Sequence, residues 1–369
     1  MKILLIGDAS NYHYSLSRGL KALGHDVTLA SNGGRWMHTR RDIDIFRRDN
    51  PLAGAMLYAR LSTVLAKRLK GYDVVQFASP GFVDLRPRLL EKLLRRLRRD
   101  NGALYLTALG TDVATVRNLT GPHPALEYSE WQINGKPTAW AMSDASQLDS
   151  WRKQPLCNYN EAFYGTIDGV VSALYEYHRI IEAEYPSMPL AYGGIPVVCS
   201  DFTAKIKPDH DGKIKILYAV HKHRIAEKGA DILWTLLSRL RDERPDAVEL
   251  ITPPNVPYDK FASILADADI VCDQLYSYTP ATTALMGMAS GVVPITGGED
   301  DFYAFIGEDS LRPALNPDPR DTEGTYRRLL ALVDDREALR SMSRQAAEFV
   351  RKHNDSVTVA RRFVDFWQR

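Results

Sequence analysis

Short apolar runs alternate with amphipathic stretches in both halves of this chain of 369 residues. Near the start, residues 2–6 predict a buried strand, and residues 14–23 predict a helix that ends at Gly24. Residues 26–30 predict a second strand. A strand, a helix and a strand in this order form a βαβ unit, whose strands are parallel and covered on both faces. The alternation therefore predicts an α/β protein with doubly wound, Rossmann-like sheets.

The same alternation continues along the chain. Further strands of the first half are predicted at 73–77, 103–108 and 169–172. Strands of the second half are predicted at 215–220, 248–251, 270–273 and 292–295. Helices of the second half are predicted at 230–241, 258–266, 280–290, 322–333, 336–353 and 357–368. From 118 to 166 the periodicity fades and Trp131, Trp140 and Trp151 stand among turn residues, which indicates a long functional insertion.

A polar stretch at 205–209 lies between the two halves and marks the predicted domain boundary. We expect an N-terminal Rossmann-like domain at 1–205 and a second one at 206–355. Open α/β sheets bind ligands beyond the carboxyl ends of their strands. The cleft between two facing domains is therefore the expected site.

Composition excludes several classes of protein. The apolar run after Met1 is too short for a signal peptide, and no run reaches the length of a membrane span. Three cysteines without paired spacing favour a reducing, cytoplasmic setting over a disulfide framework or a zinc site. Net charge is +1, but residues 1–99 carry 19 Lys and Arg against 8 Asp and Glu. This asymmetry suggests an anionic partner near the first domain.

The stretch from Asp273 to Gly298 contains a predicted anion site. Thr279 is a good N-cap and Pro280 suits the first helical position, so the helix is expected to start there. Its free N–H groups, together with the hydroxyls of Thr282 and Thr283, can hold a diphosphate. The alternative is an ordinary βαβ unit whose small residues serve packing alone.

A basic loop follows the first strand of the second half. The sequence YAVHKHRIAEKGAD, from 218 to 231, places Lys222, Arg224 and Lys228 between a strand and a helix, beside two histidines. Cations there would neutralise a pyrophosphate held by the neighbouring helix. The alternative is that these charged side chains only form a solvated surface and bind no ligand.

These two segments resemble the group 1 glycosyltransferases of GT-B architecture, which are retaining and similar to family 4. The family's Lys-Gly and Met-Ala-x-Gly stand here as Lys228-Gly229 and Met288-Ala289-Ser290-Gly291. Its opening βαβ unit resembles residues 2–31, and ALGTDV, 108–113, stands where the family often has His-Gly-Ser-Asp. The resemblance spans nearly the whole chain. It implies that the final helix, 356–369, crosses back to the first domain.

The chain departs from that family at its Glu pair. The positions of the two Glu, which contact the donor sugar and the ribose hydroxyls in the family, hold Tyr278 and Met286 here. Donor recognition must therefore differ, and activity does not follow from the fold. The remaining polar groups that can recognise a sugar or ribose are Asp273, Gln274, Tyr276 and Tyr278. Asp273 can equally be the ordinary end of a buried strand.

The resemblance implies roles for single residues. We expect Arg224 and Lys228 to neutralise the leaving diphosphate and Asp112 to orient a hydroxyl group, with a helix cap as the alternative role of Asp112. His13, in the turn after Gly7, can reach the ligand or lie on the surface. The catalytic residues we expect are Asp112, Arg224 and Lys228. The donor-binding residues we expect are Gly7, His13, Lys222, Asp273, Tyr278, Thr282 and Thr283.

A strongly basic helix is predicted within residues 84–100. It has leucines on one face and arginines around the rest, so it can lie on an anionic membrane surface or pack its leucines on the sheet. Trp36 and Phe46 add aromatic side chains among cations in the basic segment 35–50. Nucleic acid is not an expected partner, because no known binding module accompanies the charge.

The sequence therefore favours a glycosyltransferase that moves a sugar from a nucleotide-sugar donor to a glycan or lipid-linked acceptor. We expect no cofactor and no metal, because the GT-B architecture that the resemblance implies does not depend on an obligatory divalent metal. The expected location is cytoplasmic, with peripheral binding at the inner membrane face left open. Two alternatives remain, a GT-B-like protein that binds nucleotide-sugar or glycan without turnover and a sugar-nucleotide epimerase.

Overall fold

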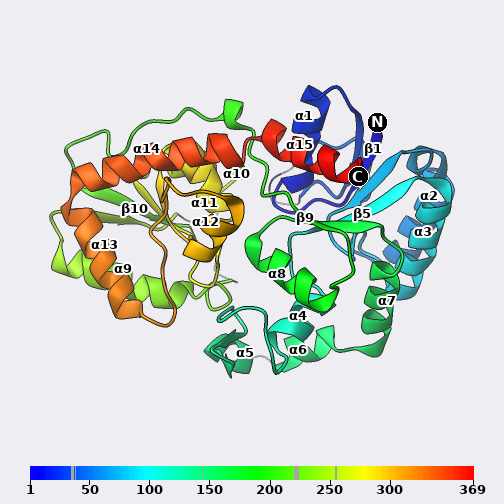
Figure 1. The fold of residues 1–369 in the computed structure, drawn as a ribbon, viewed down its shortest axis with the longest axis horizontal. Coiled ribbons are helices and arrows are strands. Elements are labelled where there is room, and N and C mark those ends of the chain that lie inside the picture. The colour runs from blue at the N-terminus through cyan, green and yellow to red at the C-terminus, as the bar shows by residue number, and fades with distance from the viewer. Residues whose placement is uncertain (35–36, 38, 144, 220–223, 254–255) are drawn as a thin grey trace. The chain divides into compact units, whose positions relative to one another are not determined.

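The chain forms two compact units in a computed structural model, which describes residues 1–34, 37, 39–143, 145–219, 224–253 and 256–369 (Figure 1). Unit 1 contains Met1–Ala125, Asp144–Pro196 and Ser356–Arg369. Unit 2 contains Leu126–Ser143 and Val197–Asp355. The domains expected at 1–205 and 206–355 stay a prediction.

Unit 1 is built on one parallel sheet with the strand order β3-β2-β1-β4-β5-β8-β9. Its strands are β1 (Lys2–Ile6), β2 (Asp26–Ser31), β3 (Ile43–Asp44), β4 (Val74–Phe77), β5 (Ala103–Ala108), β8 (Gly169–Ser172) and β9 (Leu190–Tyr192). The central strands are buried on both faces, which explains their continuous apolar runs. The predicted doubly wound α/β class is confirmed.

Helices cover the sheet of unit 1. They are α1 (Tyr12–Ala22), α2 (Ala53–Ser62), α3 (Pro87–Asp100), α4 (Val113–Leu119), α6 (Ala145–Trp151), α7 (Gln154–Tyr164), α8 (Tyr175–Glu184) and α15 (Ser356–Trp367). The final helix, α15, lies beside α1 (Figure 1). A Cβ atom at Gly19 would lie 2.0 Å from the Ser356 carbonyl oxygen, so only glycine permits this approach. The predicted return of the C-terminal helix to the first half is confirmed.

The basic helix, α3, packs its apolar face into unit 1. Leu90, Leu93, Leu94 and Leu97 are at most 4% exposed and belong to the same hydrophobic core as the sheet strands. The alternative in which α3 covers the sheet is therefore confirmed, because a buried leucine face cannot enter a lipid surface. Within the described residues, no helix is long and apolar enough to cross a membrane.

Unit 2 is built on a smaller parallel sheet with the strand order β11-β10-β12-β13. Its strands are β10 (Ile214–Tyr218), β11 (Val248–Ile251), β12 (Ile270–Cys272) and β13 (Val293–Ile295). Its helices from the second half are α9 (Ala230–Glu243), α10 (Tyr258–Asp267), α11 (Thr282–Ala289), α12 (Asp300–Ile306), α13 (Thr322–Asp334) and α14 (Arg336–His353). Leu233, Leu237 and Leu240 of α9 are buried in its core.

A segment from the middle of the predicted insertion belongs to unit 2. It contains the antiparallel strands β6 (Gln132–Ile133) and β7 (Lys136–Pro137), followed by α5 (Ala139–Ser143). Trp131 and Trp140 pack edge to face within it, with ring centroids 4.5 Å apart. The sequence did not predict this hairpin, because two-residue strands carry no measurable periodicity.

Candidate functional site

Lys228 and Asp273 form a buried ion pair in unit 2. The Lys228 Nζ atom lies 2.6 Å from Asp273 Oδ1, and the side chains are 14% and 0% exposed. Asp273 directly follows β12, whereas Lys228 precedes Gly229, whose φ of +61° lets the chain turn into α9. The Leu275 amide donates to the Lys228 carbonyl at 2.8 Å, so the two loops are also joined through their backbones. A fixed cation therefore lies at the carboxyl edge of this sheet.

Two buried oxygen atoms at this edge of the sheet lack hydrogen-bond partners within the described part of the chain. They are Asp273 Oδ2, after β12, and Thr296 Oγ1, after β13. Cys272 and Ile295 are paired in register, so Asp273 and Thr296 leave neighbouring strands at the same edge. Buried polar atoms are nearly always hydrogen-bonded, and exceptions indicate functional sites or bound water. This edge is also where open α/β sheets bind ligands.

Helix α11 begins near this edge, but later than predicted. Its first residue is Thr282, and Ala281 is the N-cap with φ −91° and ψ −177°. The predicted start at Thr279 and Pro280 is wrong, because the loop holds Tyr278 and Thr279 buried and the backbone of Ala281 is still extended. Alanine has no side chain that can cap the helix, so the first-turn amides depend on other partners. The first turn still carries Thr282 and Thr283, both partly exposed.

The other predicted cations are less well placed or lie outside the described residues. Arg224 is 55% exposed and donates through Nε and Nη2 to the carboxylate of Glu227, three residues further on. Its role as a diphosphate ligand stays a prediction. Lys222, together with the neighbouring His221 and His223, lies outside the described residues, as does Trp36.

Tyr278 is held by the hairpin segment of unit 2. Its ring stacks on Tyr128, with centroids 4.4 Å apart and an interplanar angle of 16°, and its hydroxyl accepts from the Tyr128 amide at 3.1 Å. The Tyr128 hydroxyl lies 2.6 Å from Glu299 Oε1 and 3.1 Å from the Ser277 carbonyl oxygen. Arg320 lies over the Tyr128 ring and pairs with Glu127. The segment thus places a carboxylate, Glu299, beside the position where the family has its first Glu.

Removing the Tyr128 hydroxyl should loosen this segment. We expect Tyr128→Phe to lower the free energy of unfolding by about 2 kcal/mol, because a partly buried hydrogen bond to a carboxylate is lost. Chemical denaturation measures this loss, and faster protease cleavage within 126–143 would locate it. The control is Tyr58→Phe, since Tyr58 makes no hydroxyl hydrogen bond that the described structure records. Equal stability of Tyr128→Phe and the wild type would show that the hydroxyl does not anchor the hairpin.

Met286, at the second Glu position, is 6% exposed and packs in a small apolar cluster of unit 2. Its sulfur lies 3.7 Å from the Tyr258 hydroxyl. Neither position of the family's Glu pair therefore offers a carboxylate in this fold.

Asp112 caps a helix of unit 1. Its Oδ1 accepts from the Thr115 amide and hydroxyl, both at 2.8 Å, and its Oδ2 accepts from the Tyr164 hydroxyl at 2.7 Å. Burial raises the pKa of the Asp112 carboxyl, while these hydrogen bonds lower it. The capping alternative is confirmed. The catalytic role stays a prediction.

Gly7 and His13 lie together in unit 1, where β1 turns into α1. Gly7 has a φ of +81°, and a Cβ atom there would come within 3.1 Å of Ala78 Cβ. His13 is fully buried, so the surface alternative is wrong. Its Nδ1 donates to the Gly7 carbonyl at 2.8 Å, which leaves Nε2 to accept from the Thr107 hydroxyl at 3.2 Å. His13 thus anchors the Gly7 turn, and its role in donor binding stays a prediction.

The buried imidazole predicts a pH-dependent stability. Burial lowers the pKa of His13 to about 4, whereas an unfolded histidine titrates near 6.5. The unfolded state therefore binds more protons between these values, and stability is lost as pH falls through this range. We expect the stability advantage of the wild type over His13→Gln to shrink by about 2 kcal/mol between about pH 7 and about pH 5, measured by urea unfolding.

The Asp8 carboxyl changes the stability with pH in the direction opposite to His13. Its carboxylate accepts from the His13 and Tyr14 amides, and burial raises its pKa to about 6. Since the His13→Gln variant keeps Asp8, the difference between the two proteins isolates the imidazole. A difference that is constant with pH would contradict a neutral, buried His13.

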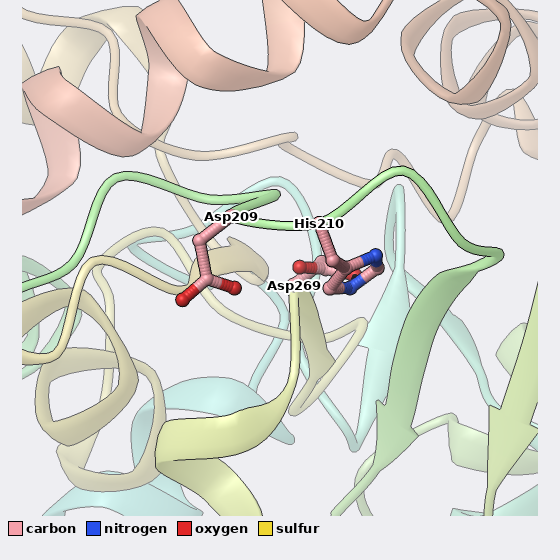
Figure 2. A group of neighbouring side chains, drawn as sticks. All are labelled: Asp209, His210 and Asp269. Atoms are coloured by element: carbon pink, nitrogen blue, oxygen red, sulfur yellow. Dashed lines mark hydrogen bonds and ion pairs between the residues drawn. The ribbon is translucent and has the colours of Figure 1, made fainter.

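One group of possible metal ligands occurs among the described residues. It consists of Asp209, His210 and Asp269, whose ligand atoms lie within 4.8 Å of one another (Figure 2). The Lys207 ammonium, with a side chain only 3% exposed, lies 3.3 Å from Asp209 Oδ1. Asp269 Oδ2 accepts from the Lys215 amide and from His210. A buried ammonium disfavours a second cation, so we interpret the group as an ion-pair network at the amino edge of the sheet.

Comparison with known proteins identifies the architecture. No family model and no curated protein matches the chain. Sucrose-phosphate synthase from Thermosynechococcus elongatus superposes with a TM-score of 0.65, covering 100% of this chain and 98% of that chain at 12% identity. An alpha-glucosyltransferase in complex with UDP superposes with a TM-score of 0.63 at 13% identity, and both chains are covered completely. The chain has the GT-B fold. The architecture predicted from the sequence is thereby confirmed.

Other GT-B structures show what this fold accommodates. Anabaena HepE in complex with UDP matches with a TM-score of 0.58 at 11% identity, and covers both chains completely. A putative UDP-N-acetylglucosamine 2-epimerase from Listeria monocytogenes matches with a TM-score of 0.52 at 12% identity. The alpha-glucosyltransferase also occurs in complex with UDP and a 13-mer DNA. The GT-B fold alone therefore leaves the reaction and the acceptor open.

Proposed function

We propose that this GT-B protein is a glycosyltransferase that uses a nucleotide-sugar donor, with UDP as the nucleotide. The observation that carries the proposal is the Lys228–Asp273 pair, which lies with a buried, unpartnered carboxylate oxygen at the carboxyl edge of the unit 2 sheet. A preorganised ammonium at this edge can stabilise the negative charge that develops on a leaving diphosphate. The complexes of HepE and the alpha-glucosyltransferase with UDP support the choice of nucleotide.

The proposed reaction transfers the sugar with retention. The acceptor hydroxyl oxygen bonds to the anomeric carbon while the bond from that carbon to the β-phosphate oxygen breaks. The hydroxyl proton passes to the departing diphosphate, and Lys228 compensates the remaining charge. We assign the first-turn amides of α11, with Thr282 and Thr283, to the same diphosphate. Arg224, Lys222 and Asp112 keep the roles expected from the sequence as proposals.

One alternative is favoured by a specific observation. Tyr278 is covered by Tyr128, and Met286 is buried in an apolar cluster, so the family's carboxylate pair has no counterpart at those positions. This favours a protein that binds nucleotide-sugar without turnover. A glycan or lipid-linked acceptor is proposed for the enzyme, and the cytoplasmic location expected from the cysteines stays a prediction.

Thermal unfolding with UDP, GDP and their sugars tests the proposal. A ligand that binds only the folded state raises the melting temperature. We expect stabilisation by UDP and UDP-sugars, followed by transfer or slow hydrolysis in an assay of sugar release. Stabilisation without release would favour the binding protein, and the absence of any nucleotide effect would overturn both readings.

A further inference from the structure

Exposed apolar side chains gather in one segment of unit 1. Among the described residues, seven large apolar side chains are exposed, and four of them lie between residues 46 and 64. Their exposed fractions are Phe46 46%, Leu52 69%, Met56 59% and Val64 75%. Scattered surface leucines are normal, but a concentration in one short segment indicates an interaction surface.

Helix α2 explains how these side chains come to face outward. Its inner face, formed by Ala53, Leu57 and Leu61, is buried in the core of unit 1. Leu52 and Met56 are four residues apart and therefore lie on one outer face of the helix. Within α2, Arg60 is the one charged residue. A surface helix that is apolar on both faces has a face without a protein partner. Figure 1 shows α2 beside α3 at the border of unit 1.

The segment that contains α2 is rich in cations. Residues 40–70 carry eight Lys and Arg against three Asp. Arg48, Arg60 and Lys67 are exposed, and Arg47 lies against the start of α2, with its Cζ 3.7 Å from where a Cβ of Gly54 would stand. Arg96 of α3 donates to the Ser62 carbonyl at the end of α2 at 2.8 Å. Exposed aliphatic side chains and exposed cations thus occur together in this segment.

We propose that this surface, formed by Phe46, Leu52, Met56, Val64, Arg48 and Arg60, docks on an anionic lipid bilayer. Leu52 and Met56 would enter the boundary between headgroups and acyl chains, while the cations contact lipid phosphates. A nucleic acid would be held by the same cations, but it offers no apolar medium for Leu52, Met56 and Val64. Docking concerns unit 1 and needs no donor. Its use in reaching a lipid-linked acceptor rests on the proposed function.

Vesicle co-sedimentation of the full chain tests the docking surface. We expect binding to vesicles of phosphatidylcholine and phosphatidylglycerol in equal parts, and little binding to phosphatidylcholine alone. The double variant Leu52→Ser, Met56→Ser should bind the anionic vesicles about tenfold more weakly, because apolar area no longer enters the lipid. Arg48→Glu, Arg60→Glu should weaken binding at least as much. The matched control, Met142→Ser, removes a side chain of unit 2 that is 68% exposed and should change nothing.

Two results would overturn the proposal. Equal vesicle binding by the Leu52→Ser, Met56→Ser variant and the wild type would show that these side chains do not enter the lipid. Binding of the protein to a DNA duplex but not to vesicles would show that the cations bind nucleic acid. The substituted side chains are exposed, so folding is expected to persist and circular dichroism checks it. Thermal stabilisation by UDP, measured on the same variants, keeps the two proposals separate. Lost UDP binding with intact docking would count against the transferase alone.

Discussion

Lys228→Met should lower the free energy of unfolding by about 3 kcal/mol and remove the thermal stabilisation by UDP. The stability loss is expected because Asp273 is fully buried, and without the ammonium its charge has no compensating partner. Turnover should fall about a hundredfold or more, since a charge that stabilises the leaving diphosphate is absent. Urea unfolding, thermal shift and sugar release measure the three effects.

A second substitution separates the stability effect from the binding effect. Lys228→Met with Asp273→Leu replaces both partners of the pair by apolar groups, which is often nearly neutral for stability. We expect the double variant to recover to within about 1 kcal/mol of the wild type and still to show no UDP stabilisation. Lys215→Met is the matched control, because Lys215 pairs with the exposed Asp267 at the amino edge of the same sheet. Undiminished UDP stabilisation in Lys228→Met would reject the assignment of Lys228.

Gly19→Ala should destabilise the protein by about 3 kcal/mol. Alanine favours a helix over glycine by about 1 kcal/mol, so helix propensity alone predicts the opposite sign. The added Cβ would lie 2.0 Å from the Ser356 carbonyl oxygen and 3.0 Å from Ala360 Cβ, and therefore α15 would have to move away from α1. Urea unfolding measures the loss.

Gly110→Ala is the control for this substitution. A Cβ atom at Gly110 would meet nothing within 4 Å, and the expected change is within about 0.5 kcal/mol. If Gly19→Ala were as stable as Gly110→Ala, α15 would not lie as close to α1 as the structure places it.

Long, regular elements could be predicted from the sequence. The strands at 2–6, 103–108, 169–172 and 248–251 and the helix at 336–353 have the predicted bounds, because buried apolar runs and a long amphipathic period dominate there. The edge strands β3 and β9 have two and three residues, too few for a period to show. The start of α11 was misplaced because Thr279 and Pro280 suit a helix start locally, whereas Tyr278 and Thr279 are buried by tertiary packing and the helix begins only at Thr282.

The candidate site was only partly predictable. Lys228 and Asp273 were both named from the sequence, but their direct pairing joins loops 45 residues apart, which no local pattern reveals. Tyr128 and Glu299 were missed for the same reason, since Tyr128 reaches Glu299 across 171 residues. A turn histidine such as His13 carries no local sign of burial. It is buried because α1 packs between the sheet and α15.

The most direct test of the central claim is a crystal structure of the protein with UDP or UDP-glucose bound. We predict that the diphosphate lies within hydrogen-bond distance of the Lys228 Nζ atom and of the first-turn amides of α11 at Thr282 and Thr283. A nucleotide bound elsewhere, with Lys228 still paired to Asp273 and distant from the phosphates, would contradict the account.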